Sequence, residues 1–576
     1  MEPKRASVLN GISLKESHWD LILPVVLVIG CLYLFGKGVG SYALWDPWEP
    51  KYAQAARTML DQGDFITPRY EGEIRWSKPI LIYWAIAAST WLGTESELFI
   101  RLPSVLAATL AVLFLYFALK KIRSRPMAMM AACILATTPQ FFYMARQATP
   151  DMLYVLFVVG TMGFFALGRF GQGSGRTYFL LSYVSLALAF LTKGLAAVAV
   201  AFCAAVLFLL LDCQVDDPDN PRSLGFRLKE RLSTYQVPLG SLLFLLVSGI
   251  WLVPVYLQHG WAFFDHFIFY HHVVRFSETL LNHKGFLTYY LQPLFHGMYP
   301  WSALLPISLI FLFQDRQKLD EQTLQRWYFL AWFLVVFLLF TAAATKLQHY
   351  FLPATPFVAV LVAFIWEKQM EEKPNYWLAP TFLLSIPVFW LIIQDFLNNS
   401  SSYLFFNFNN NRRSIDNSDS LESFLLTLFF FWAVIMVLAS FRKFSRLNAT
   451  YAVIAALANG IYFSHNVLPD HSIKRTFKYY VAQFQENRTD AGEIFHISGS
   501  HNTFTYYCPS KECHYFSWRD REAFFEQVIG KADVHIIVKK RQRRKLVKEL
   551  SQRTGMSWHT VASDHPHFSM IKNRPN

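Results

Sequence analysis

Residues 194–211 have the sequence GLAAVAVAFCAAVLFLLL, an apolar run without a charged side chain. A helix of this length matches the roughly 30 Å hydrocarbon core of a bilayer. In lipid the run must be helical, because only a helix satisfies its own backbone donors and acceptors. Similar runs recur along the chain. We predict thirteen spans, near residues 21–40, 100–119, 126–143, 151–168, 177–191, 194–211, 237–257, 291–313, 327–344, 350–366, 376–395, 423–440 and 449–467.

The composition supports a polytopic α-helical membrane protein. Of the 576 residues, 54% are hydrophobic and only 16% are charged, whereas soluble domains have about 25% charged residues. A net charge of +13 would also suit a nucleic-acid-binding protein. The basic residues, however, gather in short loops beside spans, as at 120–125, 222–231 and 442–446. This is typical of cytoplasmic loops, so we exclude nucleic acid as a partner.

The charge pattern also predicts the topology. The segment 79–92, PILIYWAIAASTWL, is short for a span and is interpreted as a juxtamembrane or re-entrant helix. With residues 1–20 in the cytoplasm, the basic loops then all lie inside, and 41–99 and everything after 468 lie outside. If 79–92 spanned the membrane, the basic loop 120–125 would face out. We therefore divide the chain into a membrane domain, 21–468, with an outer loop, 41–99, and a C-terminal tail, 469–576.

The tail has a different sequence pattern from the spans. Its apolar runs shorten to strand length at 493–497, 503–507 and 534–538 and alternate with helical patterns at 518–530 and 540–554. This alternation predicts a small α/β domain. Cys508 and Cys513 would form a disulfide if the tail is extracytoplasmic, or remain free thiols. The Asn- and Ser-rich segment 397–422 is predicted to be an exposed loop.

Ionisable residues gather at the predicted outer membrane surface. They are Asp46, Glu49, Lys51, Lys78, Asp151, Lys193, His271, His272, Arg275, Lys346, His349 and Tyr350. Each has a structural alternative: lysines at helix ends can extend to headgroups, Asp151 suits a helix N-terminus, and histidines and Tyr350 suit the interface. Their convergence on one face favours a site. Cations can bind the phosphate of a lipid-phosphate sugar, and a carboxylate can act as a base or stabilise developing positive charge.

The sequence contains a series of motifs that resemble those of a known family. The motifs are WDPWEPKYAQAARTML (45–60), GDFITPRYEGEIRWSKPILIYW (63–84), ARQATPDMLYVLF (145–157), FLTKGLAAV (190–198), HHVVRF (271–276), GMYPWSALLP (297–306) and TKLQHYFLP (345–353). In this order they resemble polyprenyl-phosphate-dependent glycosyltransferases of the GT-C class. That class includes the bacterial aminoarabinose transferases that act on lipid A and, more distantly, the protein O-mannosyltransferases. The resemblance covers about residues 40–366, and thirteen spans with a periplasmic α/β tail also resemble the aminoarabinose transferases.

The resemblance implies roles for individual residues. The family's acidic pair falls at Trp48 and Glu49, so its first acid is missing here. Glu49 is the favoured catalytic carboxylate, with Asp46 as the alternative and Asp151 as a further carboxylate near the cavity. Donor-phosphate contacts are expected from Lys51, Tyr52, Lys78, Arg275, Lys346 and Tyr350.

A metal site is also implied, but in weakened form. His272 matches a histidine that, together with a glutamate, contributes to a metal site in aminoarabinose transferases, and Ser77 replaces that glutamate. The sequence requires no cofactor and leaves a divalent metal open.

We therefore expect an integral-membrane glycosyltransferase of the bacterial inner membrane with a periplasmic active site. It would pass a sugar from a polyprenyl-phosphate donor, undecaprenyl phosphate being favoured, to a lipid A-like or other envelope acceptor, with inversion at the anomeric carbon. Three alternatives stay open. One is a GT-C transferase with a protein or polysaccharide acceptor, and another is a transporter or flippase of a polyprenyl-linked sugar. The third is a catalytically inactive homologue, because Trp48 replaces the first acid.

Overall fold

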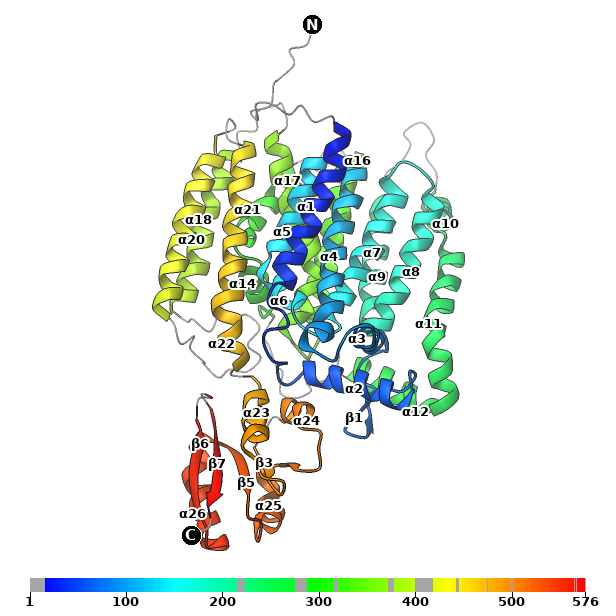
Figure 1. Ribbon diagram of the computed structural model, residues 1–576. Coiled ribbons are helices and arrows are strands. Elements are labelled where there is room, and N and C mark those ends of the chain that lie inside the picture. The colour runs from blue at the N-terminus through cyan, green and yellow to red at the C-terminus, as the bar shows by residue number, and fades with distance from the viewer. Residues whose placement is uncertain are drawn as a thin grey trace.

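The computed structural model combines a helical bundle with a C-terminal sheet domain at one end (Figure 1). It describes residues 16–214, 223–274, 287–314, 320–370, 378–398, 418–441, 445–473, 475–498, 501–563, 565 and 567–574. Of the predicted loop 397–422, residues 399–417 lie outside the described residues, and the described ends, 397–398 and 418–422, are helical. We call the end of the bundle that faces the sheet domain the tail end.

Nine of the described helices are long and apolar enough to cross a membrane, or ten if a bent pair is taken as one span. The chain is therefore a multi-pass membrane protein. The long helices are α1 (Glu16–Gly36), α4 (Glu97–Ile122), α7 (Asp151–Phe170), α8 (Gly175–Lys193), α9 (Leu195–Asp212), α11 (Val237–His259), α16 (Glu321–Ala342), α17 (Thr355–Met370), which continues the short helix η4 (Gln348–Ala354), and α20 (Ser418–Ala439). They are joined by α5 (Arg125–Thr137), α6 (Pro139–Ala145), α14 (Leu291–Gly297), α15 (Leu305–Gln314), α18 (Leu378–Asn398), α21 (Ser445–Tyr462) and α22 (Leu468–Ile473).

All thirteen predicted ranges fall mainly on helical residues, but two are broken. The span predicted at 126–143 is the pair α5 and α6, which bends by 65°. Thr138 at the break is extended, with ψ of 121°, because the ring of Pro139 excludes the helical conformation from the preceding residue. The range 291–313 is also interrupted, between α14 and the short helix Trp301–Leu304. The number of crossings stays a prediction.

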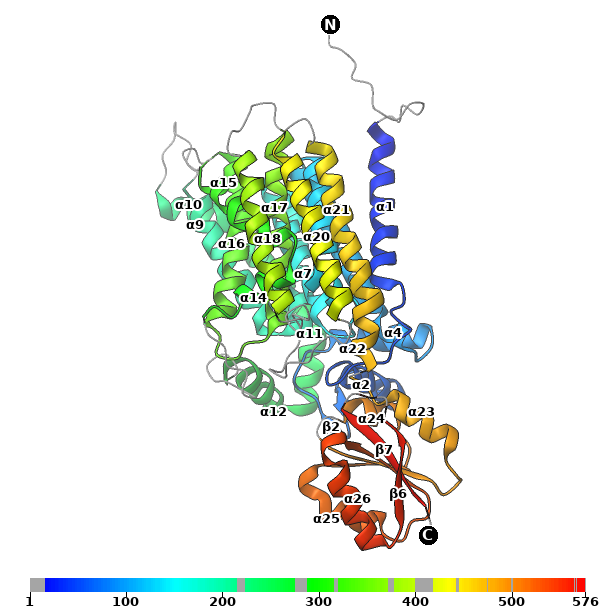
Figure 2. The same cartoon turned by 90° about the vertical axis from the view of Figure 1, so that its left-hand side faces the viewer.

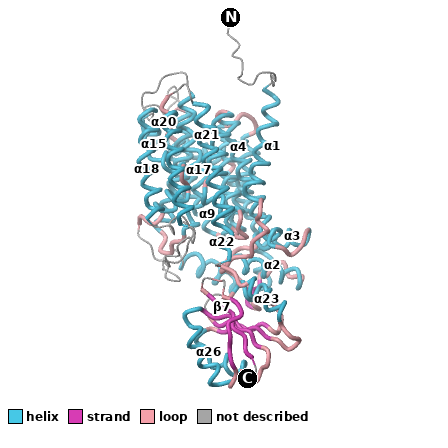
Figure 3. Tube along the Cα trace, turned by 60° about the vertical axis from the view of Figure 1, so that its left-hand side comes forward, coloured by secondary structure: helices cyan, strands magenta, loops and turns pink. Residues whose placement is uncertain are grey.

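The loop 41–99 lies at the tail end of the bundle (Figures 1 and 3). It contains α2 (Glu49–Gln62), a hairpin of β1 (Arg69–Tyr70) and β2 (Glu73–Ile74), and α3 (Leu81–Leu92). α3 has 12 residues, too few for a span, as the interpretation of 79–92 as a juxtamembrane helix requires. α2 begins with Pro50 in its first turn and ends at Gly63, whose φ of 68° terminates the helix.

The tail forms a five-stranded mixed sheet with helices on both faces (Figure 2). The strands are β3 (Glu493–Ile497), β4 (Cys513–Phe516), β5 (Val534–Lys539), β6 (Ser557–Ala562) and β7 (Phe568–Arg574), in the order β4-β3-β5-β7-β6. β3 pairs in parallel with β4 and β5, whereas β7 is antiparallel to β5 and β6. The predicted α/β class of the tail is confirmed.

Side-chain alternation along the central strands separates two apolar cores. Phe495 and Ile497 pack on one face with residues of α25 (Arg521–Val528) and α26 (Lys540–Thr554). Ile494 and Ile537 pack on the other face with α23 (Lys478–Asn487) and α24 (Asn502–Tyr507). The predicted strands at 493–497 and 534–538 are confirmed, and so are the helical stretches at 518–530 and 540–554.

The strand predicted at 503–507 is wrong, because these residues form α24. The alternating sequence TFTYY suits a strand, but tertiary contacts override that preference. In a helix, Thr503 and Tyr507 share one side and contact loop 41–99, at Asp46 and Leu44. Phe504 and Cys508 share another side and pack in the tail core. The four-residue spacing of these two pairs favours the helix.

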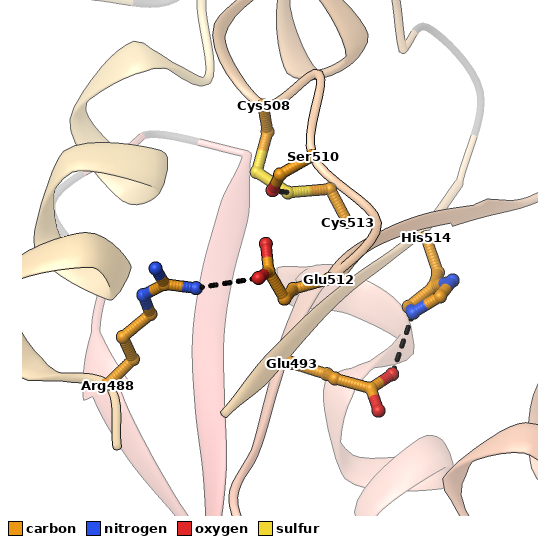
Figure 4. Close-up of a disulfide and its surroundings, with 7 residues drawn as sticks. All are labelled: Arg488, Glu493, Cys508, Ser510, Glu512, Cys513 and His514. Carbon is orange, nitrogen blue, oxygen red and sulfur yellow. Dashed lines mark hydrogen bonds and ion pairs between the residues drawn. A yellow bond between two sulfur atoms is a disulfide. The ribbon is translucent and has the colours of Figure 1, made fainter. Parts of the chain in front are cut away.

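Cys508 and Cys513 form a disulfide that joins the end of α24 to β4 (Figure 4). Their Cα atoms are 5.9 Å apart, and the other four cysteines are free. We expect reduction to destabilise the tail by about 2 kcal/mol, the chain-entropy value for so short a loop. Hydrogen exchange of α24 and β4 amides, with and without reductant, measures this. The double variant Cys508→Ser/Cys513→Ser should exchange at the rate of the reduced protein, and reductant should not change that rate. If reductant leaves the exchange of the wild type unchanged, the prediction is wrong.

The tail should lose stability in acid because histidines are buried in its α23/α24 face. Burial, aided by the nearby His501, Lys539 and His565, lowers the pKa of His496 to about 3, and burial lowers the pKa of His535 to about 4. The unfolded chain takes up protons near pH 6.5, so stability is full above that pH and falls as pH decreases toward the folded pKa. For His496 the slope reaches about 1.4 kcal/mol per pH unit.

Hydrogen exchange of β3 and β5 in the full-length protein, compared between pH 7 and pH 5 after correction for the intrinsic exchange rate, checks this expectation. His496→Phe removes one titrating group without creating a cavity, so it should reduce the pH dependence. Equal pH dependence in this variant and the wild type would show that His496 is not the cause.

Candidate active site

Glu49 lies in a buried ion pair with Arg101 of α4. Its two oxygens accept hydrogen bonds from Arg101 Nε and Nη2 at 2.7 Å each, and from the backbone N–H groups of Trp45 at 2.9 Å and Ala148 at 2.8 Å. The Glu49 side chain is 2% exposed and that of Arg101 is fully buried. Four hydrogen bonds engage the lone pairs of the carboxylate inside the protein. The carboxylate favoured from the sequence is thus held by an ion pair and two backbone donors, and its catalytic role stays a prediction.

The same arginine fixes the start of loop 41–99. Arg101 Nη1 donates to the carbonyls of Val39 and Tyr42, and Nη2 donates to that of Ala43, each at 2.8 Å. The guanidinium also lies 4.1 Å from the centre of the Tyr42 ring. Arg101 is not among the site residues predicted from the sequence. The available signal was a charged residue inside an apolar helix, which is costly unless it is paired.

Asp46 lies at the junction of loop 41–99 with the tail and is half-buried. Its backbone N–H donates to the carbonyl of Arg475 at 2.9 Å. Its carboxylate accepts the N–H of Thr503 at 2.8 Å and the hydroxyl of Thr503 at 3.1 Å. Asp46 is therefore less buried than Glu49, and Thr503 orients its carboxylate.

Cations and phenols gather beside Asp46. Lys51 Nζ lies 5.5 Å from the centre of the Tyr70 ring. The Arg75 guanidinium lies 5.1 Å from the Tyr52 ring, and its Nε donates to Tyr83 Oη at 3.1 Å. Two cations in one partly buried region attract an anion such as a phosphate. Arg75 was not among the predicted site residues, although it stands in the same charged loop.

Electrostatics link these groups to each other and to α7. Burial lowers the pKa of Lys51, the positive charge of Arg75 lowers it further, and the carboxylates of Glu71 and Asp46 oppose that shift. Burial raises the pKa of Tyr52; Arg75 opposes this rise, and the Asp151 carboxylate adds to it. Tyr52 is therefore within electrostatic range of both Arg75 and Asp151.

Asp151 and Lys193 form a second group at the tail end. Lys193 Nζ lies 2.5 Å from Asp151 Oδ1, and both side chains are buried. The ammonium also lies 5.3 Å from the Tyr154 ring and 5.6 Å from the Tyr350 ring. The structure thus brings together Asp151, Lys193 and Tyr350, which are far apart in the sequence.

Lys346 and Lys78 differ in their placement. Lys346 Nζ donates to the carbonyls of Thr341 at 2.6 Å and Ala343 at 2.8 Å, so it caps the C-terminal end of α16. Burial lowers the pKa of Lys346. Lys78 is half-buried between β2 and α3. Arg275 lies outside the described residues, as do the side chains of His271 and His272, so their roles stay predictions.

The described residues do not fit a metal site. Within the ranges given above, no group of three or more His, Cys, Asp or Glu could hold an ion. Ser77 stands where the resemblance would place a coordinating glutamate, and its hydroxyl is a poor substitute for a carboxylate. We therefore assign no step of the reaction to a metal ion.

Comparisons with known proteins agree with the fold. The family model of dolichyl-phosphate-mannose-protein mannosyltransferases matches residues 77–216. The structure matches the crystal structure of ArnT from Cupriavidus metallidurans bound to undecaprenyl phosphate, with a TM-score of 0.68, 17% identity, and coverage of 97% of this chain and 98% of that one. The chain has the GT-C fold. The resemblance seen in the sequence is confirmed.

Curated relatives point the same way. Two undecaprenyl phosphate-α-4-amino-4-deoxy-L-arabinose arabinosyl transferases match, one from Edwardsiella ictaluri at 29% identity over 324 residues and one from Aeromonas salmonicida at 30% over 349 residues. The first alignment covers 56% of this chain and 55% of the relative, and the second covers 59% and 60%. The alignments thus span little more than half the length of these relatives.

Proposed function

We propose that this protein is an integral-membrane glycosyltransferase that takes a sugar from a polyprenyl-phosphate donor. One observation carries the proposal: the cations Lys51 and Arg75, the phenols Tyr52 and Tyr70 and the carboxylate Asp46 meet at one end of a GT-C bundle. These residues lie in the loop whose sequence resembles the family. A lipid-linked donor can reach such a site from the bilayer while its phosphate meets the cations.

The reaction would be a single displacement at the anomeric carbon. An acceptor oxygen forms a bond to that carbon as the bond from the carbon to the donor phosphate oxygen breaks, so that polyprenyl phosphate leaves. Lys51 and Arg75 would stabilise the negative charge that develops on the departing phosphate, with Lys78 as the further lysine of the motif. Attack from the opposite face inverts the anomeric carbon.

We assign Asp46 as the carboxylate that acts on the acceptor. If the acceptor is a hydroxyl, Asp46 takes up its proton as the bond forms. If the acceptor is a phosphate, as on lipid A, no strong base is needed and Asp46 would orient the acceptor. Glu49 is unsuited to either task because its oxygens already accept four hydrogen bonds from inside the protein. Asp151, paired with Lys193 and within electrostatic range of Tyr52, would help to orient that phenol.

We further propose that the tail end faces the periplasm of a bacterial inner membrane. Basic loops at the opposite end support this orientation. The disulfide in the tail supports it independently, because disulfides persist in oxidising compartments. The donor would be undecaprenyl-phosphate-linked, in keeping with the names of the relatives. The acceptor would be lipid A or another envelope glycoconjugate, as the resemblance in the sequence implies.

A protein acceptor is the second candidate, and the description of the matching family model favours testing it. We would follow radiolabelled sugar from undecaprenyl-phosphate donors into lipid A, polysaccharide and protein fractions of cells with and without this protein. Label that appears in one fraction only with the protein present supports the transferase and identifies the acceptor. If no fraction gains label while the donor changes its side of the membrane, the protein is a flippase and the proposal fails.

A further inference from the structure

The tail contacts loop 41–99 mainly through α24, the short helix of the sheet domain nearest the bundle (Figure 1). Thr503, which is fully buried, holds both oxygens of the Asp46 carboxylate, one through its N–H and one through its hydroxyl. The Thr503 hydroxyl also accepts the N–H of Phe477 at 3.2 Å. One tail residue therefore fixes the rotamer of the carboxylate that we assign to the acceptor.

Tyr507 adds a second contact one helical turn later. Its hydroxyl accepts the N–H of Leu44 at 2.7 Å and donates to the carboxylate of Glu97 at 3.0 Å. Glu97 also pairs with Lys478 of the tail. Because Glu97 begins α4, Tyr507 joins the backbone beside Asp46 to the helix that carries Arg101.

Two further contacts flank this pair. Tyr70 of the hairpin donates to Asn502 Oδ1 at 2.8 Å, and the ring of Tyr70 faces Lys51. Tyr506 donates to Glu95 at 2.9 Å, and the Arg57 guanidinium lies 4.2 Å from the centre of its ring. The tail thus contacts the elements that carry the candidate carboxylate and one of the candidate cations.

α24 is itself held rigidly. Phe504 is buried in the core of the sheet domain, and the helix ends at Cys508, whose disulfide to Cys513 ties it to β4 (Figure 4). A carboxylate held from a rigid element loses less orientational freedom when it acts on a substrate than one on an unsupported loop.

We propose that α24 positions loop 41–99 for catalysis, with Thr503 and Tyr507 as positioning residues that act through Asp46. The tail is then a part of the transferase site and not a separate module. This inference rests on the proposed function, because it assumes that Asp46 acts on the acceptor.

The test compares Thr503→Val with a matched control in the same domain. Val keeps the shape and the backbone N–H and removes only the hydroxyl. Thr489→Val is the control, because Thr489 also donates through its N–H and its hydroxyl to a carboxylate, here to one oxygen of Asp533, entirely within the tail. Two measurements are made on the full-length protein: hydrogen exchange of residues 41–48, and the kcat and KM of label transfer.

Thr503→Val should speed exchange in 41–48 and lower kcat about tenfold, with little change in the KM for the donor. Thr503→Ser should have wild-type exchange in 41–48 and a wild-type kcat. Thr489→Val should leave both of these quantities unchanged. If Thr503→Val fails to accumulate, Tyr507→Phe tests the second contact of α24, with Leu44 and Glu97. Its control is Tyr480→Phe, which loses a hydrogen bond to the Phe568 carbonyl inside the tail.

The outcomes separate the two proposals. If the wild type transfers sugar and kcat in Thr503→Val stays at the wild-type value, the positioning role is overturned and the transferase stands, whatever the exchange data show. If the wild type transfers no sugar from any donor, the proposed function itself fails, even where Thr503→Val speeds exchange in 41–48. The exchange experiment needs no activity, so docking of α24 is measured in either case.

Discussion

Asp46→Asn lowers sugar transfer to a hydroxyl acceptor by about a hundredfold or more while the protein accumulates normally; this is the result we expect for the carboxylate of the acceptor site. General-base catalysis by a positioned side chain contributes roughly 10²–10⁴-fold, and an amide cannot take up a proton. Asn has the shape of Asp: its carbonyl oxygen can accept the N–H of Thr503, and its amide nitrogen can donate to the Thr503 hydroxyl. The loss would therefore fall on kcat more than on folding or on donor binding.

The control for Asp46→Asn is Asp61→Asn, a change of the same kind at an exposed position on α2. It should leave transfer unchanged. The measurement is label transfer per unit of membrane-inserted protein, at saturating donor. An Asp46→Asn protein with wild-type kcat would remove Asp46 from the mechanism for a hydroxyl acceptor. The acceptor would then be a phosphate, which needs no strong base.

The sequence was sufficient to predict the architecture of the bundle, because membrane crossing imposes a simple length and composition on each span. The apolar run at 194–211 corresponds nearly residue for residue to α9, Leu195–Asp212. The α5–α6 break also has a local cause in Pro139, although the helix prediction did not use it. The tail was harder to predict. β6 and β7 carry mixed polar sequences such as SWHTVA, which give a weak strand signal.

The site was only partly predictable, because its decisive contacts join distant residues. Spacing alone placed Asp46, Lys51 and Tyr52 in one charged loop, and the structure agrees that they lie near one another. Nothing local to Glu49 indicates that Arg101, 52 residues away, engages its carboxylate. The contact of Thr503 with Asp46 spans 457 residues. Such partners are set by packing of the fold, which a local pattern does not encode.

The ion pair between Glu49 and Arg101 gives the prediction with the largest effect on stability. Breaking a buried pair by removing one charge typically costs about 3–5 kcal/mol, because the remaining charge stays buried without compensation. Glu49→Gln should therefore lower the midpoint of thermal unfolding in detergent and reduce the amount of folded protein. Arg101→Met should cost at least as much, since the carbonyls of Val39, Tyr42 and Ala43 also lose their donor.

Glu95→Gln is the matched control for Glu49→Gln, because Glu95 pairs with Arg57 at the surface, with side-chain exposures of 43% and 25%. Exposed pairs contribute about 0–1 kcal/mol, so its unfolding midpoint should hardly move. The Glu49→Gln molecules that remain folded should transfer sugar at a rate closer to the wild type than Asp46→Asn does. The opposite pattern, a stable but inactive Glu49→Gln, would mean that the Arg101 pair opens when substrate binds and that Glu49 is the catalytic carboxylate after all. Stability and activity measured on the same two variants thus separate a residue that holds the loop from one that acts on the substrate.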